Sequence, residues 1–244
     1  MSFIISGDTH GTLDLGKVRR FFNENKNKYT KDDYLIIVGD VGICGFHAEE
    51  EKKTREVFRN LPVTTLFIDG NHEHFGKLNS YTVEEWNGGK VHFIEDNMIH
   101  LMRGQVFDIN GTKFFTFGGA HSVDKMYRTV GLSWFPEEMP YLEEYEEGWK
   151  NLEKVDFKVD YILTHTGPRE AVAALGYGIM SDEEIELRQY LQRVADETDF
   201  KAWYFGHFHM DTEIEDMFFC LYDELVVIES TTPTYGLRLR GRSL

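Results

Sequence analysis

Side chains able to bind metal ions occur in five short motifs along the chain. The motifs are Asp8-Thr9-His10, Gly39-Asp40, Gly70-Asn71-His72-Glu73, Thr164-His165 and Gly206-His207-Phe208-His209. Carboxylate and amide oxygens combined with imidazole nitrogens suit divalent ions such as Mn²⁺, Fe²⁺ and Zn²⁺. Each motif alone is a common chance pattern, because Asp-x-His, Gly-Asp and His-x-His recur in turns and at strand ends. Their combination in one chain predicts a centre for two divalent metal ions.

Each motif follows a short apolar run that is typical of a buried β-strand. These runs cover residues 3–6, 34–38, 63–68, 161–164 and 202–205. Helical patterns at residues 15–25 and 49–60 separate the first three runs, which indicates a parallel sheet covered on both faces. Open α/β sheets bind ligands beyond the carboxyl ends of their strands. We therefore expect the motifs to converge on one rim.

The pattern changes between residues 91 and 117, where short strands follow one another closely. Asn110-Gly111 separates two apolar runs and predicts a type I′ hairpin, so the sheet becomes antiparallel or mixed here. A long loop is expected at residues 122–136, followed by an acidic helix over residues 137–155. Strands at 217–222 and 225–229 complete the pattern. No linker-like stretch interrupts the chain, which predicts an α/β fold in a single domain, residues 1–244.

Charge and cysteine content exclude several kinds of partner and site. With 42 acidic and 26 basic residues, the chain of 244 residues carries a formal charge of −16. This charge repels long nucleic acid and anionic membranes, while bound divalent ions would still attract a small anionic substrate. Cys44 and Cys220 lie far apart, so neither a disulfide framework nor a cysteine zinc site is expected. Without a secretory or membrane-spanning pattern, the expected location is cytoplasmic.

Taken together, the motifs resemble those of the calcineurin-like metallophosphoesterases, which read Asp-x-His, Gly-Asp, Gly-Asn-His-Asp/Glu, His and Gly-His-x-His. The resemblance covers most of the chain. It implies a central β-sandwich of two mixed sheets flanked by helices, and two divalent metal ions, with Mn²⁺ expected first and Fe²⁺ or Zn²⁺ as alternatives. The implied ligands are Asp8, His10 and His209 for one ion, Asn71, His165 and His207 for the other, and Asp40 as the bridge between them.

The resemblance also implies an activity, the hydrolysis of phosphoester bonds in small or nucleotide-type substrates, either monoesters or diesters. The nucleophile would be a hydroxide activated by the two metal ions that Asp40 bridges. His72 would protonate the leaving group or stabilise the transition state. Asn71 would contact the substrate as well as a metal ion.

One part of the family pattern is missing from this chain. In the phosphoprotein-phosphatase branch the second motif continues to Asp-Arg-Gly, which supplies a phosphate-binding arginine, whereas here Val41 and Gly42 follow Asp40. A serine/threonine phosphatase is therefore less expected, and the arginine must come from elsewhere. Arg128 lies in the predicted loop, and His121 follows a glycine pair just before it, so both are candidate substrate contacts.

Two alternatives remain, a non-catalytic scaffold and a different enzyme. Some proteins of this fold, such as the retromer scaffold subunit, have lost metal ligands and act through their surface. Because all the implied ligands and His72 are present here, we expect catalysis. The other alternative is a nuclease, for which the acidity of the chain favours short over long nucleic acids.

Overall fold

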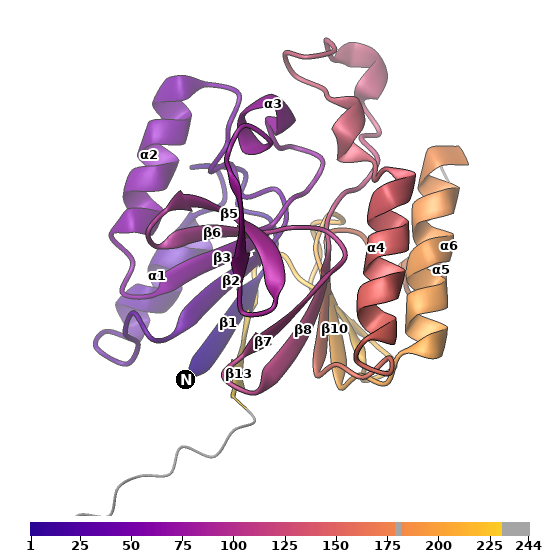
Figure 1. The fold of residues 1–244 in the computed structure, drawn as a ribbon. Coiled ribbons are helices and arrows are strands. Elements are labelled where there is room, and N and C mark those ends of the chain that lie inside the picture. Colours follow the sequence, from indigo (N-terminus) through magenta and orange to yellow (C-terminus); the bar gives the residue numbers. More distant parts are fainter. Residues whose placement is uncertain (179–181, 231–244) are drawn as a thin grey trace, which may run out of the picture.

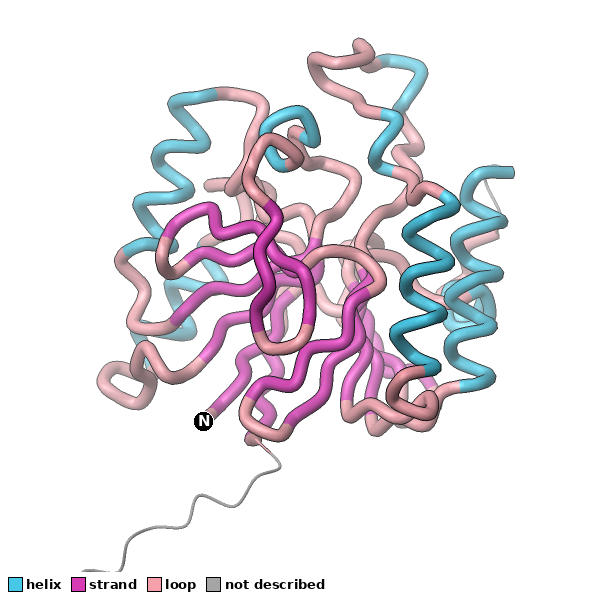
Figure 2. The backbone as a smooth tube through the Cα atoms, in the orientation of Figure 1, coloured by secondary structure: helices cyan, strands magenta, loops and turns pink. Residues whose placement is uncertain are grey.

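Two β-sheets face each other in the computed structural model, which describes residues 1–178 and 182–230 (Figure 1). Both sheets are mixed, and helices cover the outer face of each one (Figure 2). The expected central β-sandwich of two mixed sheets flanked by helices is confirmed. That residues 1–244 form a single domain stays a prediction, since residues 179–181 and 231–244 lie outside the described part.

The first sheet has the strand order β13-β1-β2-β3-β6-β5-β4. Its strands are β1 (Ser2–Ser6), β2 (Tyr34–Val38), β3 (Thr64–Ile68), β4 (Val83–Trp86), β5 (Gly89–Glu95), β6 (Met98–Leu101) and β13 (Leu225–Glu229). β1, β2, β3 and β6 run parallel, and β13, β5 and β4 are antiparallel to their neighbours. The carboxyl ends of β1, β2 and β3 therefore share one edge.

The second sheet repeats this plan, with a parallel centre and antiparallel edges. Its order is β11-β12-β10-β9-β8-β7. The strands are β7 (Gln105–Ile109), β8 (Thr112–Phe117), β9 (Tyr161–Thr164), β10 (Ala202–Phe205), β11 (Thr212–Ile214) and β12 (Phe218–Cys220). β8, β9, β10 and β12 are parallel, whereas β7 and β11 pair antiparallel. The ends of β9 and β10 thus also lie at a single edge.

Helices flank the two sheets on opposite sides. They are α1 (Gly16–Glu24), α2 (Ala48–Arg59), α3 (Phe75–Leu78), α4 (Leu142–Glu153), α5 (Arg169–Ala174) and α6 (Asp182–Glu197). Side chains of α1, α2 and α3 pack on the first sheet, and those of α4, α5 and α6 pack on the second. None of the helices in the described ranges is both long and apolar enough to cross a membrane.

The alternation of side chains along the strands explains this layered arrangement. In β1, Phe3 and Ile5 point into the core between the sheets, while Ile4 packs with the helices outside. The Phe3 ring contacts that of Phe114 from the second sheet edge to face, with centroids 4.8 Å apart. Because strands such as β1 are buried on both faces, they read as continuous apolar runs.

Most expected elements are present, and the differences have local causes. The hairpin is confirmed: Asn110 and Gly111 both have positive φ, at 53° and 78°, between β7 and β8. The acidic helix, expected from residue 137, begins only at Leu142 in α4. Pro140 disfavours helical conformation at Met139, which is extended with ψ at 140°. A short 3-10 helix, Pro136–Glu138, takes the place of the first expected turn.

Candidate metal centre

The five motifs meet where the strand ends of the two sheets approach each other. Asp8, Asp40 and Asn71 follow β1, β2 and β3, while His165 and His207 follow β9 and β10. Backbone hydrogen bonds join the motifs directly, since the amide of His10 donates to the carbonyl of Asp40 (2.8 Å) and that of Gly206 to the carbonyl of His165 (3.0 Å). The side chains are thus held by the edges of both sheets.

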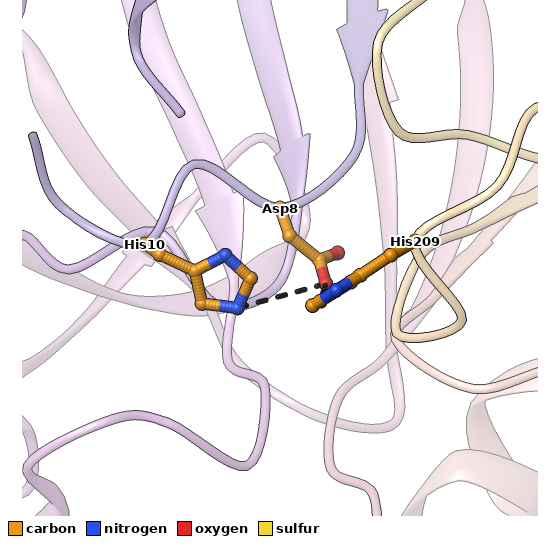
Figure 3. A group of neighbouring side chains, drawn as sticks. All are labelled: Asp8, His10 and His209. Atoms are coloured by element: carbon orange, nitrogen blue, oxygen red, sulfur yellow. Dashed lines mark ion pairs between the residues drawn. The ribbon is translucent and has the colours of Figure 1, made fainter. Parts of the chain in front are cut away.

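One group of potential ligands surrounds the carboxylate of Asp8. His209 Nε2 lies 3.1 Å and His10 Nε2 3.9 Å from Asp8 Oδ2, and Figure 3 shows the two imidazoles converging on this carboxylate from different loops. His10 Nε2 is also 3.3 Å from Asp40 Oδ2. Ligand atoms of Asp8, His10 and His209 all lie within 4.8 Å of one another, a spacing that one metal ion could bridge.

A second group lies on the other side of Asp40. His165 Nε2 is 3.5 Å from Asp40 Oδ1 and 3.1 Å from Asn71 Oδ1, and the rings of His165 and His207 are 5.1 Å apart. Asp40 therefore faces His10 with one oxygen and His165 with the other. This arrangement fits a carboxylate that bridges two metal ions, and the mixed oxygen and nitrogen donors fit divalent cations.

The backbone is strained at several of these positions. Positive φ values occur at His10 (41°), Asp40 (51°), His207 (69°) and His209 (51°), a conformation that is costly for residues other than glycine. Nearby, Gly70 is required for space, because a Cβ there would lie 2.1 Å from Asp40 Oδ1. Strain concentrated on potential ligands is typical of functional sites, where surrounding structure enforces a geometry that the chain alone would avoid.

Contacts outside the ligand groups orient the imidazoles. Asp14 Oδ2 lies 2.8 Å from His10 Nδ1, and the carbonyl of Val38 lies 2.8 Å from His165 Nδ1. Each contact fixes the ring so that Nε2 faces the site, as is usual for metal-binding histidines. Sequence analysis did not single out Asp14, although its position four residues after His10 is the spacing of neighbours on a helical turn.

Lys17 is a further residue that the sequence patterns did not reveal. It is buried in α1 and donates to the carbonyl oxygens of Asp8 (2.6 Å) and Tyr222. The Tyr222 ring stacks on that of His209, with centroids 4.7 Å apart. Lys17 therefore joins the backbone of one potential ligand to the residue that supports another. Because this link spans most of the chain, no local pattern could have predicted it.

The charged groups of the site compensate one another. Burial would raise the pKa of Asp40, but His165, His72 and His10 hold it well below the usual value. Burial would lower the pKa of His165, but Asp40 and Asp8 raise it to about 10. In the same way Asp40 raises the pKa of His10 to about 9. Divalent cations would replace the protons on these imidazoles, so metal binding should release protons.

His72 lies beside the ligand groups and contacts Arg128. Its backbone amide donates to Asp40 Oδ1 at 2.7 Å, and its ring nitrogens are 3.0 and 3.2 Å from Arg128 Nη2. Asp124 holds the guanidinium through an ion pair of 2.7 Å. Burial, together with the charge of Arg128, lowers the pKa of His72. The long loop thus brings Arg128 against His72, and its contact with a substrate stays a prediction.

Of the other two candidate substrate contacts, Asn71 lies within the site and His121 lies at its border. Asn71 Nδ2 donates to Ser122 Oγ (3.1 Å), which in turn donates to Glu138 Oε2 (2.6 Å). His121 directly precedes Ser122 in the chain, and burial raises the pKa of the Glu138 carboxyl. His121 therefore lies next to the residue that accepts a hydrogen bond from Asn71.

A buried ion pair supports the end of β3 just before the third motif. Arg103 Nη2 and Nε lie 2.6 and 2.8 Å from Asp69 Oδ2, and His100 Nε2 lies 3.2 Å from Asp69 Oδ1. Burial would raise the pKa of Asp69, but Arg103 and His100 hold it well below its usual range. The pair anchors the strand end from which Asn71 and His72 project.

Replacing Arg103 by Met should lower the free energy of unfolding by about 3–5 kcal/mol, because Asp69 would remain buried without its cation. Urea unfolding measures this loss. Arg59 offers a matched control, since it forms an ion pair with Glu95 (2.7 Å) at the surface. The Arg59 side chain is 53% exposed. Arg59→Met should cost less than about 1 kcal/mol. Similar losses in both variants would contradict the anchoring role.

Comparisons with known proteins agree with this architecture. The family model "Calcineurin-like phosphoesterase" matches residues 1–211. No curated protein sequence matches the chain, whereas 21 chains of solved structures do.

Two of these structures illustrate the likeness. The phosphopantetheinyl hydrolase PptH from Mycobacterium tuberculosis is 17% identical, with 91% of this chain and 89% of that one covered and a TM-score of 0.47. A candidate 5′-nucleotidase from Staphylococcus aureus, solved with α-ketoglutarate, is 12% identical, with 93% of this chain and 50% of that one covered and a TM-score of 0.50. At 12% identity the likeness to the second structure shows the fold alone. From the extent of the family match, the chain belongs to the calcineurin-like phosphoesterases.

Proposed function

We propose that the protein hydrolyses phosphoester bonds of small substrates with two divalent metal ions, and that Mn²⁺ supports the activity. The observation that carries this proposal is the position of Asp40, whose two carboxylate oxygens face His10 and His165 at 3.3 and 3.5 Å. Asp8, His10 and His209 would hold one ion, and Asn71, His165 and His207 the other. The net charge of −16 supports small over polymeric anionic substrates.

When bound, the two ions would supply a hydroxide at neutral pH and neutralise charge on the phosphoryl group. The chain contributes the remaining parts. Asp14 and the carbonyl of Val38 keep His10 and His165 oriented with Nε2 toward the site. His72, half-buried beside Asp40, is the acid that donates a proton to the leaving oxygen. The Arg128 guanidinium, next to His72, would bind a phosphoryl oxygen.

The proposal is tested by metal removal and replacement. Protein stripped with a chelator should lose hydrolysis of 4-nitrophenyl phosphate and of bis(4-nitrophenyl) phosphate, and added Mn²⁺ should restore it with two ions bound per chain. The ratio of the two rates shows whether the protein prefers monoesters or diesters. Metal analysis by mass spectrometry is the parallel readout. Two tightly bound ions without turnover of either ester would favour a scaffold instead of an enzyme.

A further inference from the structure

A pocket of about 240 Å³ opens directly beside the candidate metal centre. His10, Asp40 and His72 line the end that adjoins the centre. Leu13 and Phe46 contribute apolar walls, and the Leu13 side chain is 77% exposed without a ligand. An apolar pocket that adjoins reactive groups is a common form of substrate site. Neither wall residue belongs to the metal-binding motifs, so the pocket extends the site beyond the potential ligands.

Two glycines let backbone segments approach each other closely at this pocket. Gly11 and Gly42 line it and both have positive φ, at 63° and 75°. A Cβ on Gly42 would lie 2.3 Å from the amide nitrogen of Gly11, so the two backbones approach closely without side chains between them. The Phe46 ring is supported from behind, with its centroid 6.3 Å from that of Phe135 in a stacked arrangement. One wall is thus aromatic and held in place.

Asp40 and Glu50 are the acidic residues that line the pocket, and its basic residues are the histidines His10, His47 and His72. Neither Lys nor Arg is present among its lining residues, all of which are described by the structure. Glu50 lines it from the first turn of α2. The neighbouring Glu51 pairs with Arg55 and Lys77 at 2.8 and 2.7 Å, whereas within residues 1–178 and 182–230 no side chain pairs with the Glu50 carboxylate. A second phosphate or carboxylate of a substrate would therefore meet a free anion here.

We propose that this pocket binds the organic part of the leaving group and selects bulky apolar groups, uncharged or cationic, over anionic ones. The inference rests on the proposed phosphoester hydrolysis. His72, the acid assigned to the leaving oxygen, lines the pocket, so the leaving alcohol lies in it when its oxygen faces His72. The substrate class is then phosphoesters of aromatic or large apolar alcohols, and sugar phosphates that carry a second phosphate are disfavoured.

Charge selection is tested with phenyl esters that carry a methyl, carboxylate or aminomethyl group at the 4-position. Each is prepared as the phosphate monoester and as the methyl diester. In Glu50→Gln, kcat/KM for the 4-carboxyphenyl ester should rise about fivefold relative to the 4-methylphenyl ester, and that for the aminomethyl ester should fall. Glu49→Gln, on the same exposed helical turn but outside the pocket, should leave these ratios unchanged.

Size selection is tested with 2-naphthyl and phenyl esters of matched type. In Leu13→Ala, kcat/KM for the naphthyl ester should fall about fivefold and that for the phenyl ester less than twofold, because only the larger ring reaches the exposed wall. Leu142→Ala, at another exposed leucine (63%) on α4, is the control. Because Leu13 is largely exposed, its replacement does not threaten folding.

The possible results distinguish a failure of the pocket inference from a failure of the proposed hydrolysis. If the esters are hydrolysed but neither the carboxylate ratio in Glu50→Gln nor the naphthyl ratio in Leu13→Ala moves, the pocket does not hold the leaving group and the inference is wrong. If no ester of any kind is hydrolysed with any divalent metal, the proposed hydrolysis fails, and the pocket inference fails with it.

Discussion

Asp40→Asn is expected to lower kcat/KM for phosphoester hydrolysis by about three to four orders of magnitude. The amide keeps an oxygen that accepts the His72 amide proton, which Asp40 now binds at 2.7 Å, so the loop should stay folded. What the variant loses is the negative charge between His10 and His165. A neutral amide cannot bridge two cations as a carboxylate does, so metal analysis should find fewer than two ions per chain.

A graded control for Asp40 is Asp14, which contacts His10 but lies outside the ligand groups. Asp14→Asn should cost about 10–100-fold in activity, as for other residues that orient a metal-binding histidine. Asp40→Asn with activity within tenfold of the wild type, and with both ions bound, would show that the bridge is not made by Asp40.

His72→Ala is the second large effect, with a fall in kcat of about 10²–10³-fold for an alkyl phosphoester and retention of both metal ions. A 4-nitrophenyl ester should lose much less, since nitrophenolate leaves readily without a proton. This contrast is the mark of an acid acting on the leaving oxygen. Equal losses for the two esters would instead assign His72 to stabilising the phosphoryl group.

Arg128 contacts His72 at 3.0 Å and comes from a different loop. The effect of replacing Arg128 can therefore be compared with that of replacing His72. If the guanidinium binds a phosphoryl oxygen, Arg128→Ala should raise KM about tenfold for alkyl and nitrophenyl esters alike. Arg128→Lys should recover part of the loss. Unchanged Michaelis and turnover constants in Arg128→Ala would exclude a substrate contact.

Much of the fold was predictable because its central strands are buried on both faces. β2, β9 and β10 begin and end where the apolar runs do, and the motif residues follow them directly. β11 was missed because Thr212–Ile214 is a short, mostly exposed edge strand without a continuous apolar run. β4, at the other edge of the first sheet, has the sequence VEEW and was missed for the same reason.

The sequence predicts the site residues that lie in local motifs. It does not predict those that packing between distant parts of the chain brings to the site. Asp8, Asp40 and His165 are found from sequence because each directly follows a strand. The contact of Arg128 with His72 depends on the conformation of a long loop, and the bond of Lys17 to Tyr222 joins residues 205 positions apart. Periodicity contains no information on such pairings, which tertiary packing alone decides.

The pairing of β1 with β13 has a consequence for synthesis of the chain. Ser2 lies opposite Glu229, 227 residues later, so β1 leaves the ribosome long before its neighbour on that side exists. At about 5–20 residues per second the delay is roughly 10–45 s. Throughout this time β1 presents an unpaired apolar edge, a template for chaperones or for aggregation. Asp8 and His209 are 201 positions apart, so the nascent chain can complete its candidate metal centre only after residue 209 has been made.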